Sequence, residues 1–144
     1  MEKKLTSGLE DYLEAIYLIQ EKEGSARVKQ IAGRMGVRAA SVTGALQSLS
    51  AKGLIHYTPY EHIRLTQNGR NEAVRVESRH RLLKRFFEDV LCVEEQKAEE
   101  AACKCEHELH QEIYDKFASL MYFLESPEGT KLADKLKSRL NSEK

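Results

Sequence analysis

The chain has little of what builds disulfide-rich, membrane-spanning or disordered proteins. Of its 144 residues none is tryptophan, two are proline, eight are glycine and three are cysteine. No apolar run approaches the roughly 20 residues that a membrane helix needs, and the first residues lack the apolar core of a signal peptide. With 41% hydrophobic and 32% charged residues, the composition is typical of a helix-rich globular protein. We therefore expect a cytoplasmic protein of one or two small domains with no membrane partner.

The three cysteines, Cys92, Cys103 and Cys105, argue against a disulfide framework, which favours an even number of cysteines in a secreted chain. If the stretch around residue 104 is helical, Cys103 and Cys105 point to different sides of the helix and are poorly placed to bridge each other. We therefore expect reduced thiols.

The net charge of zero hides a strong separation of charge along the chain. Between Lys22 and Arg70 there are eight Lys and Arg against two Glu, a local net charge of +6. Between Glu88 and Glu112 there are nine acids against two Lys, a local net charge of −7. A basic segment suits a phosphate backbone, and an acidic segment suits a bound cation.

Metal-binding residue types recur at helical spacing in the acidic segment, as Cys103, Glu106 and His107. Residues three and four apart share one face of a helix, so a thiolate, a carboxylate and an imidazole would converge there. This mixed set of donors suits a transition metal ion. Asp11 and Glu14, one helical turn apart near the N-terminus, form a matching half-site.

The apolar periodicity predicts a mainly α fold with one short hairpin. Thr6 or Ser7 can cap the first helix, and Glu10 completes a capping-box pattern with Ser7. Gly24, Gly36 and Gly53 follow the first three helices as C-terminal stops. The predicted helices cover about residues 7–22, 28–35, 39–52, 67–90, 94–108, 110–125 and 130–140, with strands at 54–58 and 62–65 and breaks near Cys92 and at 126–129.

The order helix, tight turn, helix, hairpin is typical of a winged helix-turn-helix DNA-binding domain. Its second helix enters the major groove, where short polar side chains fit between base edges. Cations at the start of the preceding helix meet phosphates, and the hairpin tip forms the wing. These rules select as DNA-binding candidates Arg27, Arg38, Ser41, Thr43, Gln47, Tyr60 and His62.

Six short motifs occur in order along the chain and cover about residues 5–124. They are Glu-Asp-Tyr-Leu-Glu-Ala-Ile-Tyr, Ala-Arg-Val-Lys-Gln-Ile-Ala, Ser-Val-Thr with a trailing Lys-Gly-Leu-Ile, Leu-Thr-Gln-Asn-Gly-Arg, Arg-His-Arg-Leu-Leu, and Cys-Lys-Cys-Glu-His. Together they resemble the diphtheria-toxin-repressor (DtxR/MntR) family of metal-dependent bacterial transcriptional regulators. The chain is similar to the short, two-domain form, without the SH3-like third domain of longer members.

The resemblance implies a winged helix-turn-helix domain over residues 1–73 and an all-α dimerisation and metal-binding domain over residues 74–144. It implies a homodimer on double-stranded operator DNA. The helices after Thr66 are expected to build the dimer, because they carry more apolar surface than one small domain easily covers, at Leu82, Leu83, Phe86, Phe87, Val90 and Leu91. By position, the resemblance carries metal-ligand roles onto Asp11, Glu14, His80, Cys103, Glu106 and His107.

The ligand set mixes two signatures of this family. Iron-type members have methionine in place of Asp11, and manganese-type members have glutamate in place of Cys103. Lys84 stands where some iron-type members have an acidic ligand for an ancillary metal. By intrinsic affinity a site with one thiolate should prefer Zn²⁺, Ni²⁺ or Co²⁺ to Fe²⁺, and Fe²⁺ to Mn²⁺. Because free zinc and nickel are scarce in the cytoplasm, we expect Fe²⁺ as the working ion and Mn²⁺ second, with Co²⁺, Ni²⁺ or Zn²⁺ able to bind in vitro.

The prediction is therefore a metal-dependent repressor and not an enzyme. Two other classes of function remain open on the sequence. A hydrolytic metalloenzyme would use the same donors but needs an open coordination position and a substrate cleft. A winged-helix regulator could instead sense a small organic ligand, with the acidic cluster serving the structure alone. Metal-dependent DNA binding separates the three.

Overall fold

The computed structural model describes residues 4–142 and divides them into two compact units, the first ending at Glu77 and the second beginning at Ser78. The division falls within helix α4 (Gln67–Arg85). The predicted fold class, mainly α with an N-terminal winged helix-turn-helix, is confirmed. Within residues 4–142 no helix is both long and apolar enough to cross a bilayer.

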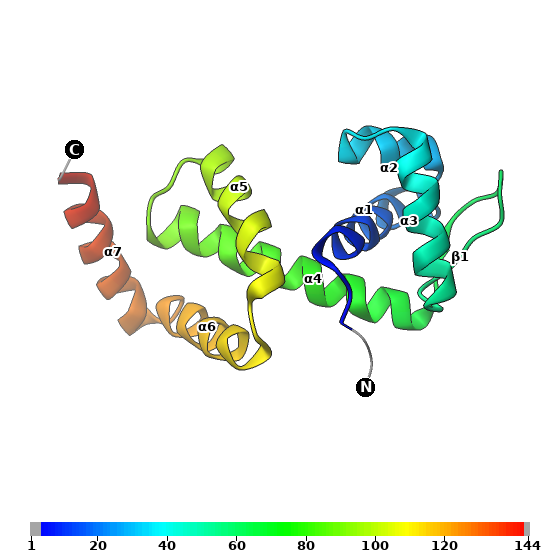
Figure 1. Cartoon of the computed structure of the whole chain (residues 1–144). Helices are drawn as coiled ribbons and strands as arrows, with labels where there is room; N and C mark the ends of the chain where they lie inside the picture. Colours follow the sequence, from blue (N-terminus) through cyan, green and yellow to red (C-terminus); the bar gives the residue numbers. More distant parts are fainter. Residues whose placement is uncertain (1–3, 143–144) are drawn as a thin grey trace. The chain divides into compact units, whose positions relative to one another are not determined.

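The first unit contains the predicted helices and hairpin in the predicted order (Figure 1). Its elements before α4 are α1 (Ser7–Glu23), α2 (Val28–Met35), α3 (Ala39–Ala51), β1 (Ile55–His56) and β2 (Arg64–Leu65). The strands pair antiparallel, Ile55 with Leu65 and His56 with Arg64. They are shorter than predicted because Ile63 forms both of its backbone hydrogen bonds with Ala26 and not with β1.

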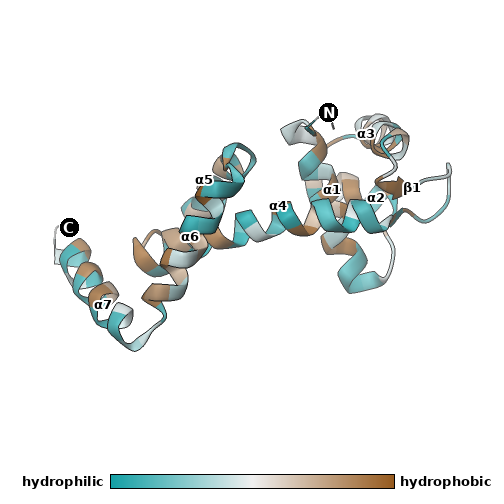
Figure 2. Cartoon of the chain, turned by 90° about the horizontal axis from the view of Figure 1, so that it is seen from below, coloured by the Kyte–Doolittle hydropathy of each residue, from teal (hydrophilic) through white to brown (hydrophobic). Residues whose placement is uncertain are grey.

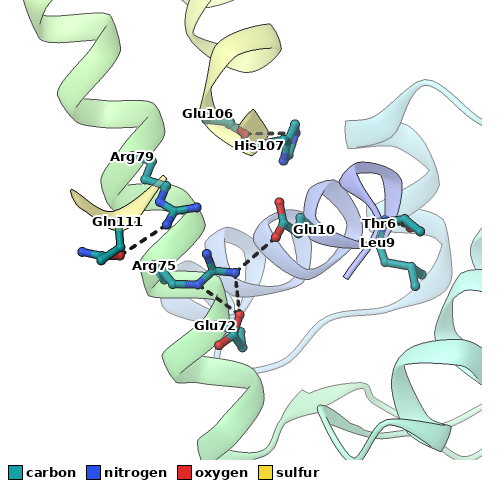
Figure 3. Close-up of polar contacts among 9 residues, drawn as sticks. All are labelled: Thr6, Leu9, Glu10, Glu72, Arg75, Arg79, Glu106, His107 and Gln111. Carbon is teal, nitrogen blue, oxygen red and sulfur yellow. Dashed lines mark hydrogen bonds and ion pairs between the residues drawn. The ribbon is translucent and has the colours of Figure 1, made fainter. Parts of the chain in front are cut away.

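Helix α1 begins and ends through two caps. Thr6 is the N-cap, and its hydroxyl accepts a hydrogen bond from the backbone N–H of Leu9 at 3.4 Å. The predicted capping box of Ser7 and Glu10 is wrong, because the carboxylate of Glu10 is buried and accepts a hydrogen bond from Arg75 at 3.2 Å (Figure 3). Gly24 ends the helix at φ +79°, a conformation that favours glycine.

One apolar core holds the first unit together. Helix α1 packs against α2, α3 and β2, and α3 also packs against β1. Each fully buried leucine or isoleucine contributes roughly 1.5–3 kcal/mol relative to an exposed one. The core therefore fixes α3 firmly on α1. Its fully buried side chains include Leu13, Ile16, Ile31, Val42, Leu46, Leu49 and Ile63.

The second unit contains helices joined by short connections, and no strand among the residues described. After the end of α4 it contains a π-helical turn η1 (Phe86–Val90), α5 (Glu95–Cys105), a 3₁₀ turn η2 (Glu106–Glu108), α6 (Gln111–Leu124) and α7 (Pro127–Ser142). Helix α7 packs against α6 and η1. The rings of Phe86 and Phe117 meet edge to face at 4.8 Å and join η1 to α6.

Two boundaries in this unit differ from the prediction. Helix α5 ends at Cys105, and Glu106–Glu108 form a 3₁₀ turn, which commonly closes the C-terminal end of an α-helix. Helix α7 begins at Pro127 and not at 130, because proline suits the first helical position and the hydroxyl of Ser126 accepts from the N–H of Gly129 at 3.1 Å. The break near Cys92 is confirmed by its φ of +56°.

Several large apolar side chains of α6 and α7 are exposed to solvent. Figure 2 shows hydrophobic and hydrophilic residues interspersed along both helices. By contrast Leu83 and Val90, two of the residues predicted to build the dimer, are buried within the second unit. The exposed large apolar residues on these two helices are Ile113, Leu120, Tyr122, Phe123, Leu132 and Leu136.

Gly69, in the first turn of α4, is required by a close approach of two backbones. A Cβ added there would overlap the carbonyl oxygen of Leu54, whereas one added at Gly44 on α3 meets no atom within 4 Å. We predict that Gly69→Ala lowers the free energy of unfolding by roughly 1–3 kcal/mol. Gly44→Ala, the matched control, should raise it by about 0.5–1 kcal/mol. Urea denaturation measures both, and equal effects would contradict the packing described here.

Candidate metal centre and DNA-binding surface

The structure brings three of the predicted metal ligands together in the second unit. One donor atom from each of His80, Cys103 and Glu106 lies within 4.8 Å of the other two. His80 comes from α4, Cys103 from the last turn of α5 and Glu106 from the start of η2. The Nδ1 of His80 lies 2.6 Å from Oε2 of Glu106. Of the three residues predicted to share a face, Cys103 and Glu106 belong to this group of donors.

Glu106 has the properties of a ligand. Its side chain is fully buried, and its Oε1 has no hydrogen-bond partner among the residues that the structure describes. The Nε2 of the buried His107 lies 3.5 Å from the same oxygen (Figure 3). Burying a charged oxygen without a hydrogen bond costs free energy, and a bound cation would offset that cost. The residues present therefore fit a divalent transition metal ion.

Two residues that sequence reasoning did not place contact this cluster. The Nε2 of His80 lies 3.1 Å from Oε1 of Glu99, and the Nζ of Lys84 lies 3.0 Å from Oε2 of Glu99. The sequence spacing could have indicated that both residues lie near the cluster, since residues four apart share a helix face. Lys84 follows His80 by four residues, and Glu99 precedes Cys103 by four.

The charges around Glu99 shift two pKa values. Burial raises the pKa of Glu99, but the hydrogen bond from Lys84 and the charge of His80 outweigh burial and leave that pKa below its usual value. The hydrogen bond to Glu99, opposed by burial, raises the pKa of Lys84. Both groups are therefore charged at neutral pH.

The two remaining predicted ligands lie in the first unit. Asp11 and Glu14 are half-buried on α1, one helical turn apart. Glu10, next to Asp11, forms its ion pair with Arg75, which also bonds Glu72 at 2.7 Å (Figure 3). This ion pair joins α1 to α4 within the first unit and fixes the turn of helix that carries Asp11.

Five of the predicted DNA-binding residues line one groove of the first unit. The groove has a volume of about 690 Å³ and is bounded by the start of α2, one face of α3 and the hairpin. Its lining includes Arg27, Thr43, Gln47, Tyr60 and His62. A groove that exposes a cation, a helix face and a wing together can receive an edge of duplex DNA.

Arg38 and Ser41 lie at the start of α3. Arg38 is the N-cap residue of α3, and Ser41 is exposed in its first turn. The N–H groups of a helix N-terminus favour phosphate. Further along the same helix, the hydroxyl of Thr43 donates to the carbonyl of Ala39 at 3.1 Å.

His62 joins the wing to the start of α2. Arg27 donates to Nε2 of His62 at 3.1 Å, so Nδ1 carries the proton that His62 donates to the hydroxyl of Ser25 at 2.7 Å. At the tip of the same hairpin, Tyr60 is fully exposed with φ +68°. These contacts hold Arg27 at one side of the groove, and the exposed Tyr60 lines it at the hairpin tip.

Family models match almost the whole chain. Residues 4–63 match the N-terminal DNA-binding domain of the iron-dependent repressors, and residues 66–132 match their metal-binding and dimerisation domain. The chain belongs to the iron-dependent repressor (DtxR/MntR) family. The resemblance seen in the sequence is thereby confirmed.

Individual relatives agree with this assignment. This repressor is 34% identical over 118 residues to an uncharacterised HTH-type transcriptional regulator from Methanocaldococcus jannaschii, covering 81% of this chain and 94% of the relative. It is 32% identical over 126 residues to the HTH-type transcriptional regulator MntR of Bacillus subtilis (strain 168), covering 88% of each. The family and these relatives are transcriptional regulators, so an enzymatic function is not favoured.

Solved structures share the fold. The manganese regulator SloR superposes with a TM-score of 0.72 at 26% identity, covering 83% of this chain and 55% of SloR. A manganese-dependent transcriptional repressor in complex with manganese gives 0.73 at 27% identity, covering 80% and 53%. The repressor thus spans about half the length of these structures. It is a metal-dependent, dimeric DNA-binding regulator that uses a divalent metal ion.

Proposed function

We propose that this repressor binds its operator when it holds a divalent metal ion, with Fe²⁺ preferred and Mn²⁺ the second choice. The proposed ligands are Asp11, Glu14, His80, Cys103, Glu106 and His107. The observation that carries the proposal is the convergence of His80 and Cys103 on Glu106, whose buried Oε1 has no hydrogen bond within residues 4–142. One thiolate among imidazole and carboxylate donors favours Fe²⁺ over Mn²⁺. The bound ion supplies positive charge to a buried carboxylate.

The proposed ligands come from α1 as well as from α4, α5 and η2. An ion that binds all of them favours one conformation of the chain, so bound metal should raise the affinity for DNA by the same factor by which bound DNA raises the affinity for metal. The DNA-binding function falls to the domain over residues 1–73 and the metal-binding and dimer functions to residues 74–144. Since DNA is the target, we place the protein in the cytoplasm.

A second copy of the chain is the proposed partner of the apolar surface on α6 and α7. The dimerisation model of the family reaches residue 132 and so includes α6 and the start of α7. The exposed apolar side chains there include Leu132, which is 59% exposed, and Ile113, which is 48% exposed. Several large apolar side chains exposed together mark an interaction surface, whereas single ones do not. A twofold dimer also presents two α3 helices to two half-sites.

Metal-dependent operator binding is the direct test. The full chain, stripped with a chelator, should bind DNA from its own upstream region weakly, and Fe²⁺ or Mn²⁺ should raise the affinity. His107→Ala should remove the activation by every ion, because it takes an imidazole from the centre. Fluorescence anisotropy under anaerobic conditions measures both, with Zn²⁺ and Co²⁺ added in parallel. Operator binding that is equally tight in excess chelator would refute the proposal.

The DNA-reading role of α3 makes a separate prediction. Arg38→Ala and Thr43→Ala should each weaken operator binding by roughly 1–3 kcal/mol, the usual cost of a lost contact to DNA, and leave metal affinity unchanged. Lys97→Ala, which removes an exposed cation from α5, is the matched control and should bind like the wild type. If both α3 variants keep full operator affinity, another element reads the DNA.

The thiolate makes a prediction about ion choice. Cys103→Glu should shift the preference toward Mn²⁺ and retain metal-dependent DNA binding, because it replaces the one soft donor with a hard one. The wild type loaded with Co²⁺ should show a thiolate-to-metal charge-transfer band that Cys103→Glu lacks. Cys105→Ser, which changes an exposed thiol two residues away, should keep the band. A Co²⁺-loaded wild type without the band, and an unchanged ion preference in Cys103→Glu, would make Cys103 a bystander.

A further inference from the structure

A chain of charged contacts approaches His80 from the side opposite Glu106. The Nζ of Lys84 lies 3.0 Å from one oxygen of Glu99, and the other oxygen of Glu99 lies 3.1 Å from Nε2 of His80. The second ring nitrogen, Nδ1, lies 2.6 Å from Oε2 of Glu106. The imidazole is therefore held by a carboxylate at each nitrogen, and both carboxylates belong to the second unit.

The two nitrogens of His80 have different neighbours. Nδ1 faces Glu106, which together with Cys103 and His80 forms the group of donors within 4.8 Å of one another. Nε2 faces Glu99, whose side chain is 47% exposed. The buried carboxylate of Glu106 on one side and the part-exposed carboxylate of Glu99 on the other give the ring a definite orientation.

We propose that Glu99 is a positioning residue of the metal centre: it accepts the Nε2 proton of His80 and leaves Nδ1 as the nitrogen that binds the ion. The inference rests on the ligand role proposed for His80. Histidines that bind metals usually donate their other N–H to a carboxylate or a carbonyl, which fixes the tautomer and raises the basicity of the ligand nitrogen.

Lys84 holds Glu99 in this position. Its ammonium lies close to three carboxylates, with Glu95 at 3.7 Å and Glu88 at 3.9 Å in addition to Glu99. Lys84 contacts Oε2 of Glu99, and the other oxygen, Oε1, lies against Nε2 of His80. The carboxylate is therefore held between the ammonium and the imidazole, which is the position that the role requires.

Metal affinity tests the role. In the full-length chain, Glu99→Ala should lower the affinity for Zn²⁺, measured by competition with a chromophoric chelator, by about 10–100-fold. Glu99→Gln keeps an oxygen that can accept from Nε2–H and should recover most of the loss. Glu100→Ala removes the same charge one residue along, where the carboxylate accepts a hydrogen bond from Gln96 at 3.4 Å, and should behave like the wild type. Circular dichroism verifies that each variant is folded.

The tautomer of His80 distinguishes a positioning role of Glu99 from a merely structural one, because loss of a structural contact would leave the tautomer unchanged. In ¹⁵N NMR spectra of the Zn²⁺-loaded protein, His80 should bind through Nδ1 and carry its proton on Nε2, and Glu99→Ala should lose that single tautomer. Binding through Nε2, or a Glu99→Ala protein with wild-type affinity and tautomer, would overturn the inference and leave the proposed function intact. A wild type that binds no stoichiometric Zn²⁺, Fe²⁺ or Mn²⁺ would overturn the proposed function as well.

Discussion

The free energy of a buried carboxylate is the constraint on which the second unit depends. Glu106 is fully buried, and one of its oxygens faces His80 while the other has no hydrogen bond within residues 4–142. Continuum electrostatics makes such a group costly unless a cation neutralises it. Much of the surrounding structure follows from this cost. His80 and His107 lie beside Glu106, and the short turn η2 brings Glu106 close to Cys103.

The first unit depends on a different constraint, because α3 must be held rigidly to fit the fixed geometry of duplex DNA. Its apolar core is formed by α1, α3 and the hairpin, and the isolated bridge between Ala26 and Ile63 ties the wing to the segment before α2. The ion pair of Arg70 and Glu21 lies at the surface, whereas the carboxylate of Glu10 in the pair with Arg75 is buried. The separation of basic and acidic segments along the sequence agrees with this difference between the DNA-binding unit and the metal-binding unit.

The sequence predicted most helices to within two residues, because apolar periodicity and three glycines mark their faces and ends. It failed where tertiary contacts override local patterns. Glu10 matches a capping box but pairs with Arg75, which lies 65 residues away in the chain, and the α-helix ends at Cys105 although nothing in its composition stops it. Helical spacing alone suggested five of the metal-ligand candidates, whereas His80 required the family pattern. The contacts of Glu99 and Lys84 could not be predicted, because they depend on the orientation of the His80 ring.

The hydroxyl groups on α3 carry a consequence for base recognition. Thr43 donates its proton to the carbonyl of Ala39, and Ser48 donates to the carbonyl of Gly44. A hydroxyl whose proton is used within its own helix offers only lone pairs to an approaching base. Among the groups on the major-groove edges, the amino groups of adenine and cytosine are the donors that can meet those lone pairs.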